Sequence, residues 1–261
     1  MLLISIIICF GASVIGAICG IGGGIIIKPM LDAFSGIDIG VINFLSGCTV
    51  LSMSIYSVIK TRISDTNALN FSITIPLSIG SVVGGIIGNS LFEVTNLYVN
   101  NSAFIRLIQN VVLFILTLSS LWYTLNMHKI KTYQIHNIIY SVCIGFILGT
   151  ISSFLGIGGG PINLIILYYF YTMKTKEAAQ NSLCIILFSQ TASLITSLYQ
   201  NDVFEIDIYF VICMVMCGIL GGIIGRSINK HISDKIAHNL LIYAMVIILM
   251  ISMYNILKIW I

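Results

Sequence analysis

The sequence "GIGGG" at residues 20–24 recurs at residues 156–160, and each copy interrupts an apolar stretch long enough to cross a membrane. Glycine in a helix interior costs about 1 kcal/mol relative to alanine, so four glycines among five residues predict a break in the helix. Close packing of membrane helices also uses small residues, but it does not require three glycines in a row. The two motifs therefore predict a chain that leaves the helical conformation twice within its apolar segments.

The composition is that of a polytopic membrane protein. Of the 261 residues, 58% are hydrophobic and 8% are charged, whereas an ordinary soluble domain has about 25% charged residues. Uncharged stretches occupy 2–27, 39–59, 69–92, 107–127, 137–173, 178–201, 208–225 and 239–257. A membrane helix needs about 20 apolar residues, and no stretch shows the alternation of a barrel strand. The sequence predicts an all-α protein with about eight transmembrane helices in the lipid bilayer.

The chain also carries an internal repeat. The word "GGIIG" occurs at residues 84–88 and 221–225, almost the same offset that separates the two GIGGG motifs, and Ser46 matches Ser182. This pattern predicts two four-helix repeats, at residues 1–127 and 137–261, joined by a basic linker at 128–136. Such duplication is typical of secondary transporters. A re-entrant half-helix after each motif gives parallel repeats, while counting it as a crossing gives inverted ones, and both remain open.

The glycine motifs predict two helix starts. Pro161 directly follows Gly160, and proline is favoured at the first helical position; the matching helix of the first half should begin near Ile25. Free N–H groups and the positive dipole end make such starts suitable for anions. The candidate binding residues are Gly22, Gly23, Gly24, Gly158, Gly159 and Gly160. Lys28 would add a positive charge; alternatively, its side chain extends to the membrane interface.

The second uncharged segment of each half is the most polar. Ser182, Ser189, Gln190, Ser193 and Ser197 share one helical face, and Asn43, Ser46 and Thr49 form a shorter stripe. We expect Ser46, Ser182 and Gln190 to line the path of a polar solute; hydrogen bonding between helices is the alternative. The "GGIIG" words are expected to serve close helix packing.

Several classes of function are disfavoured by what the spans lack. All nine acidic residues are expected in loops or at span edges, which argues against a cation substrate and against a deep proton relay. The cysteines and histidines lack metal-ligand spacing, and the spans contain no catalytic constellation. The net charge of +3 is spread through the loops, so no nucleic acid partner is expected. We expect neither an enzyme nor a cofactor.

The basic residues divide unevenly if the chain makes eight crossings. One side would hold Lys28, Arg106, Lys174, Lys176, Arg226, Lys230 and Lys235. The other side would hold Lys60, Arg62, Lys129, Lys131 and Lys258. The excess places the first set inside and both termini outside.

A glycine-rich stretch near the start of each half, a Ser/Thr-rich second helix and a GG-x-x-G third helix resemble the TauE/SafE family of sulfite and organosulfonate exporters. The resemblance covers nearly the whole chain and implies a small sulfur-containing anion exported across the bacterial cytoplasmic membrane. By position, the resemblance assigns the family's motif residues to Gly20, Gly22–Gly24 and Pro29 in the first half, and to Gly156 and Gly158–Gly160 in the second. The second half departs from the family pattern because Pro161 follows the glycines immediately. We therefore predict a secondary transporter that exports a small anion and is driven by the proton gradient. The alternatives are a membrane scaffold or assembly factor without transport, and the same fold carrying another small solute.

Overall fold

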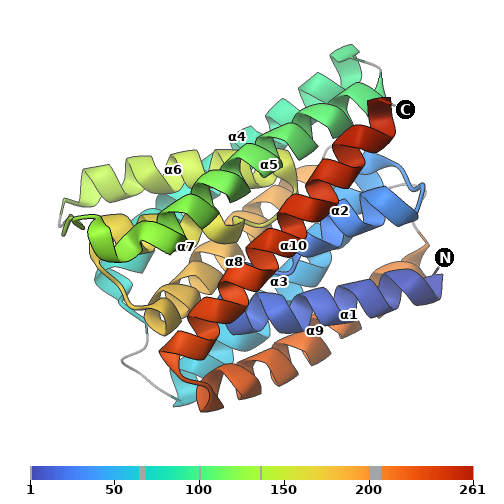
Figure 1. Cartoon of the computed structure of the whole chain (residues 1–261). Helices are drawn as coiled ribbons and strands as arrows, with labels where there is room; N and C mark the ends of the chain where they lie inside the picture. Colours follow the sequence, from blue (N-terminus) through green and yellow to red (C-terminus); the bar gives the residue numbers. More distant parts are fainter. Residues whose placement is uncertain (1, 65–68, 100, 136, 200–206, 261) are drawn as a thin grey trace.

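The computed structural model describes residues 2–64, 69–99, 101–135, 137–199 and 207–260. His136, the last residue of the expected linker, lies outside the described residues. The described chain is all-helical, with ten α-helices and one 3₁₀ turn packed into a single bundle (Figure 1). The helices are α1 (Leu2–Cys19), α2 (Gly24–Phe34), α3 (Ile39–Ser64), α4 (Phe71–Val99), α5 (Ser102–Asn126), α6 (Ile138–Leu155), α7 (Gly160–Tyr171), α8 (Thr175–Tyr199), α9 (Ile208–His231) and α10 (Asp234–Trp260).

Seven of these helices are long and apolar enough to cross a membrane in the described residues: α3, α4, α5, α6, α8, α9 and α10. The described residues form ten α-helices rather than about eight because each broken segment contributes two helices. Fewer than eight reach membrane length because the first helix of each broken segment is cut short or followed by a short one. α1 and α7 are apolar but shorter, and α2 has only 11 residues, about 16 Å of helix.

Local sequence explains where several helices begin. Asn101, Asn137 and Asp207 each accept a hydrogen bond from a main-chain N–H in the first turn that follows, at the starts of α5, α6 and α9. These short polar side chains are favoured caps because they satisfy N–H groups that have no helical partner. The starts of α2 and α7 are different, since neither has a side-chain cap.

The helix breaks fall at the two glycine motifs, as expected. α1 ends at Cys19 and α2 begins at Gly24, while α6 ends at Leu155 and α7 begins at Gly160. Each break turns the chain back toward the end of the bundle from which it came. Figure 1 shows α1 and α6 entering the bundle from opposite ends, so the two hairpins of helices point in opposite directions.

The "GGIIG" glycines serve close packing, as expected. On α4, a methyl group on Gly85 would lie 2.9 Å from the Ser189 carbonyl oxygen of α8. Methyl groups on Gly84 and Gly88 would meet the backbone of α6, and those on Gly221 and Gly225 would meet α1. Helices α4 and α9 can therefore approach their partners backbone to backbone, as small residues allow in membrane bundles.

Most of the basic residues gather at one end of the bundle, which we call the basic end. Side-chain hydrogen bonds join the end of α3 to the start of α8 and the end of α9: Thr61 to Gln180 at 2.6 Å and Gln180 to Asn229 at 3.3 Å. The main-chain N–H of Tyr133, in the linker, donates to the main-chain carbonyl of Tyr169, near the end of α7, at 2.7 Å. The basic end carries Lys60, Arg62, Lys129, Lys131, Lys174, Lys176, Arg226, Lys230 and Lys235.

The expected division of the basic residues was therefore wrong. Lys60 lines the same cavity as Arg226 and Lys230, although the sequence analysis placed it on the other side. Arg106 and Lys258 lie at the opposite end, where both contact the end of α2. The error comes from treating each broken segment as one crossing, whereas α2 and α7 return the chain toward its starting end.

Candidate functional site: paired helix starts at the centre

The two glycine motifs meet inside the bundle. A methyl group on Gly24 would lie 2.7 Å from the carbonyl oxygen of Ile157, and one on Gly160 would lie 2.5 Å from Cδ1 of Ile25. A methyl group on Gly22 would lie 3.7 Å from the carbonyl oxygen of Gly158. The residues at this junction are buried. The motifs therefore form one site, although they lie far apart in the sequence.

Glycine is required here by conformation as well as by space. Gly22 and Gly158, at equivalent places in the two motifs, have φ angles of 71° and 75°. Residues with a Cβ rarely adopt this left-handed region. These glycines turn the chain so that α2 and α7 begin beside one another.

Both helix starts present free backbone donors. The residues before α2 and α7 are Gly23 and Gly159, and neither start has a side-chain cap. Pro161 occupies the first turn of α7, where its missing N–H costs nothing. N–H groups and the positive ends of two helix dipoles thus converge on the glycine motifs, an arrangement suited to an anion.

Polar groups without partners surround this junction. Among the described residues, Ser46 Oγ, Ser182 Oγ and Gln190 Nε2 are buried and make no hydrogen bond. Ser46 Oγ would lie 2.8 Å from a methyl group on Gly24, and Gln190 Cδ would lie 3.7 Å from one on Gly158. Leaving such a group buried and unsatisfied costs about 1–3 kcal/mol. Two orphaned donors, Ser46 Oγ and Gln190 Nε2, thus lie beside two uncapped helix starts, a lining suited to a hydrogen-bond acceptor.

The other members of the polar stripe hold helices together. Ser193 and Ser197 of α8 donate to Asn89 Oδ1 of α4, at 3.4 and 3.1 Å. Ser189 Oγ lies 3.4 Å from Ser152 Oγ of α6. The outer part of the stripe therefore joins helices, as the alternative interpretation predicts, whereas Ser182 Oγ and Gln190 Nε2 have no hydrogen-bond partner among the described residues.

Asn163 joins the site and was missed in the sequence. It lies in the first turn of α7 and is buried, and its Oδ1 has no partner within the described chain. A methyl group on Gly159 would collide with its side-chain amide. The available signal was its position as a lone amide in the apolar run "PINLIIL", directly after the motif.

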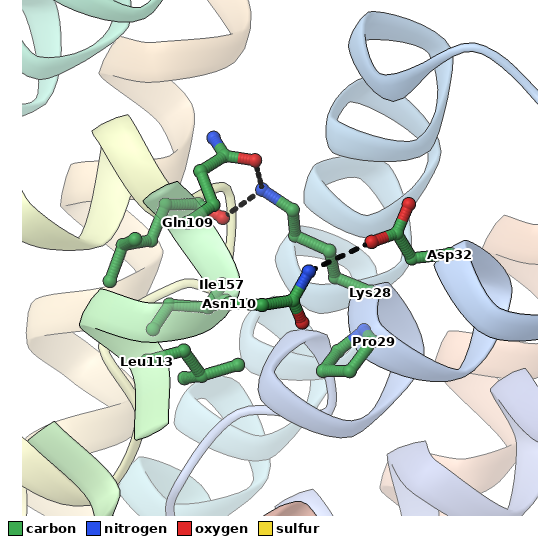
Figure 2. Close-up of a pocket in the computed structure, with 8 residues that line it drawn as sticks. Lys28, Pro29, Asp32, Gln109, Asn110, Leu113 and Ile157 are labelled. Carbon is green, nitrogen blue, oxygen red and sulfur yellow. Dashed lines mark hydrogen bonds between the residues drawn. The ribbon is translucent and has the colours of Figure 1, made fainter. Parts of the chain in front are cut away.

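Lys28 is buried rather than extended to the membrane interface. Its Nζ donates to Oε1 of Gln109 at 2.7 Å and to the carbonyl oxygen of Leu155, as Figure 2 shows. Leu155 is the last residue of α6, so the ammonium group of α2 lies at the negative end of the helix that precedes the second motif. The charge expected near the site is therefore present, and it is held by α5 and α6.

Asp32 corrects an expectation. Its carboxylate was placed at a span edge, but it lies within α2, is 5% exposed and pairs with Arg106 of α5. Asn110 donates to the second carboxylate oxygen at 3.0 Å (Figure 2). Asp32 follows Lys28 by one helical turn, a spacing that predicts a shared face once a helix is assumed.

Two cavities flank the centre. The one beside Lys28, Asp32 and Asn110 has a volume of about 10 Å³, roughly the least that holds a water molecule. A larger cavity of about 210 Å³ lies at the opposite end from the basic residues and is lined by Asp38, Asn43 and Glu93 among others. It approaches the second motif, because a methyl group on Gly156 would collide with the Asn43 side chain.

No metal site accompanies these groups: within the described ranges, no three His, Cys, Asp or Glu side chains lie together in a way that could hold an ion.

Discontinuous helices whose starts meet in the middle of a membrane bundle are typical of the binding sites of membrane transporters. Residues 5–253 match the family model described as sulfite exporter TauE/SafE. The chain therefore belongs to the TauE/SafE family and is a multi-pass membrane transporter of that family. No curated protein and no solved structure matches it.

Proposed function

We propose that this protein exports a small oxyanion, sulfite or an organosulfonate, and that the paired starts of α2 and α7 bind it. The observation that carries the proposal is the pair of orphaned donors Ser46 Oγ and Gln190 Nε2 beside two uncapped helix starts. Ser182 Oγ, on the same helix as Gln190, is also buried without a partner among the described residues. An oxyanion has several oxygen acceptors and no need for a protein acceptor. Backbone N–H groups of Gly22–Gly24 and Gly158–Gly160 would contact it, and the buried Lys28 would raise the local positive potential.

Membership of the TauE/SafE family supports the sulfur-containing class of anion. The site geometry supports the anion more generally, since sulfite and sulfonates share a pyramidal or tetrahedral head with three oxygens. Transport measurements with individual anions and an imposed pH gradient test the identity of the anion and its coupling to protons.

We further propose that residues 1–127 and 137–261 are inverted repeats. Contacts related by the sequence offset support this interpretation. A methyl group on Gly20 would meet Ala179 of α8, and one on Gly156 would meet Asn43 of α3. Gly20 and Gly156 are separated by the repeat offset of 136 residues, and so are Asn43 and Ala179, so the two contacts are equivalent under the repeat. Inverted repeats place the binding site at their interface and allow it to open toward either side in turn.

The grouping of charges supports an orientation in the bacterial cytoplasmic membrane. Cytoplasmic loops carry an excess of Lys and Arg, so the basic end would face the cytoplasm and both termini would lie outside. The anion would then move from the basic end toward the cavity of Asp38 and Glu93.

Efflux from liposomes tests the proposal. Purified protein is reconstituted with sulfite, taurine-derived sulfonates or sulfate inside, and efflux is followed under an imposed pH gradient. We expect efflux of a sulfur oxyanion that is lost in Gly24→Ala, because the methyl group would lie 2.7 Å from the Ile157 carbonyl oxygen. Gly11→Ala is the matched control, since no heavy atom lies within 4 Å of the added carbon. Absence of flux from folded, inserted protein would favour the scaffold alternative.

A further inference from the structure

Two adjoining cavities run along the contact between α3 and α9, on the outside of the bundle. The first has a volume of about 530 Å³ and aliphatic walls formed by Ile55, Ile59 and Ile63 of α3 and by Val215 and Ile219 of α9. The second has a volume of about 300 Å³. Tyr56 and Lys60 line both, so the two cavities form one continuous groove.

Close helix packing creates the floor of this groove. A methyl group on Gly222 would lie 3.2 Å from the Met53 carbonyl oxygen, and one on Gly218 would collide with the backbone of Thr49. Ser52 Oγ also donates to the Val215 carbonyl at 3.2 Å. The two backbones therefore touch, and the isoleucines on either side rise above them as walls.

The groove faces the membrane and has room for an acyl chain. Ile59 and Ile63 are 55% and 74% exposed. From Ser52 to Ile63 the groove follows about 16 Å of helix, at 1.5 Å per residue. Such a length holds most of one fatty acyl chain in an apolar environment.

The far part of the groove is basic. Lys60, Arg226, Lys230 and His231 line the second cavity at the basic end. Among the described residues, neither cavity is lined by an Asp or Glu side chain. His231 uses Nδ1 to bond the Ser227 carbonyl at 2.8 Å, an arrangement that leaves its Nε2 side for other contacts.

We propose that this groove binds an anionic phospholipid, with one acyl chain between α3 and α9 and the phosphate between Lys60 and Lys230. The charge of the second cavity complements a phosphodiester, and the apolar cavity adjoins it at Tyr56 and Lys60, as an acyl chain adjoins a headgroup. Basic pockets between membrane helices on the cytoplasmic side commonly bind such headgroups. The site is separate from the glycine motifs and does not depend on which anion is transported.

Native mass spectrometry of delipidated protein tests the site. Phosphatidylglycerol and phosphatidylcholine with identical acyl chains are titrated separately, and the bound lipid is counted. We expect phosphatidylglycerol to bind at least tenfold more tightly. The double variant Lys60→Gln/Lys230→Gln should lose that preference, with affinity for phosphatidylglycerol falling about 10- to 30-fold.

The matched control is Lys129→Gln/Lys131→Gln, which removes the same charge from the linker at the basic end. It should keep the preference, since neither lysine lines the groove. Ile219→Trp should fill the apolar part and weaken both lipids alike. Equal affinity of the wild type for the two lipids, a preference that survives in Lys60→Gln/Lys230→Gln, or an equal loss in the control would each overturn the proposal. Lys230→Gln alone, at an exposed position, replaces the double variant if that protein does not fold.

Discussion

The ammonium group of Lys28 donates a hydrogen bond to the carbonyl oxygen of Leu155, the residue before the second glycine motif. The side chain belongs to α2, which begins at the first motif. One buried charge thus links the helix start of one half to the helix end of the other. A change that moves α2 would move the second motif as well.

Lys28→Gln should reduce anion efflux and anion affinity at least tenfold. The substitution removes a buried positive charge near the site, and attraction between charges is much stronger in a protein interior than in water. Efflux from liposomes and binding of the anion by calorimetry measure the two effects.

Lys258→Gln is the control for that prediction. Lys258 of α10 is exposed and donates to the Ala33 carbonyl at 2.8 Å, near the C-terminal end of α2. It should keep most of the efflux. Equal losses in the two variants would mean that Lys28 only fixes the position of α2.

Breaking the ion pair of Asp32 with Arg106 should destabilise the protein. Asp32→Asn leaves the Arg106 guanidinium without its carboxylate in a largely buried setting, where loss of one partner costs roughly 3–5 kcal/mol. The side chains are 5% and 18% exposed, so the lower part of that range applies. Thermal unfolding in detergent measures the loss.

With the single variant Arg106→Gln, the double variant Asp32→Asn/Arg106→Gln completes a mutant cycle. It should recover part of the stability, because no unpaired charge is then buried. If the double variant lost as much stability as the two single variants together, a direct interaction between these side chains would be contradicted.

The local parts of this structure were predictable from the sequence and the long-range parts were not. The breaks near residues 20 and 156 follow from the low helix propensity of glycine, which acts on neighbouring residues alone. The side-chain partners of Lys28 and Asp32 lie on α5, more than 70 residues away, and no local pattern identifies them. The division of the basic residues failed for a related reason, since it depends on whether α2 and α7 cross the membrane or turn back.

Ser46→Ala should lower transport without lowering stability. Ser46 Oγ is buried without a partner among the described residues, so its removal relieves an unsatisfied group and is expected to be neutral or stabilising by up to about 1 kcal/mol. If the hydroxyl binds the anion, efflux should fall several-fold. Efflux and thermal unfolding of the same preparation measure both quantities.

Asn181→Ala is the comparison for Ser46→Ala. Asn181 Oδ1 accepts from the Asn70 N–H at 2.9 Å and from the Thr74 hydroxyl at 2.5 Å. Its loss should cost about 1–3 kcal/mol of stability. A Ser46→Ala protein that loses stability and keeps full efflux would assign Ser46 a structural role.

Labelling with a membrane-impermeant maleimide should place the basic end in the cytoplasm. Lys131→Cys lies in the linker at the basic end, and Asn101→Cys lies between α4 and α5 at the opposite end; both positions are exposed. In intact cells Asn101→Cys should react, and Lys131→Cys should react only after permeabilisation, because the excess of Lys and Arg favours the cytoplasmic side. The wild type, with its seven native cysteines, gives the background. Reaction of Lys131→Cys in intact cells would reverse the orientation and with it the proposed direction from the basic end toward Asp38 and Glu93.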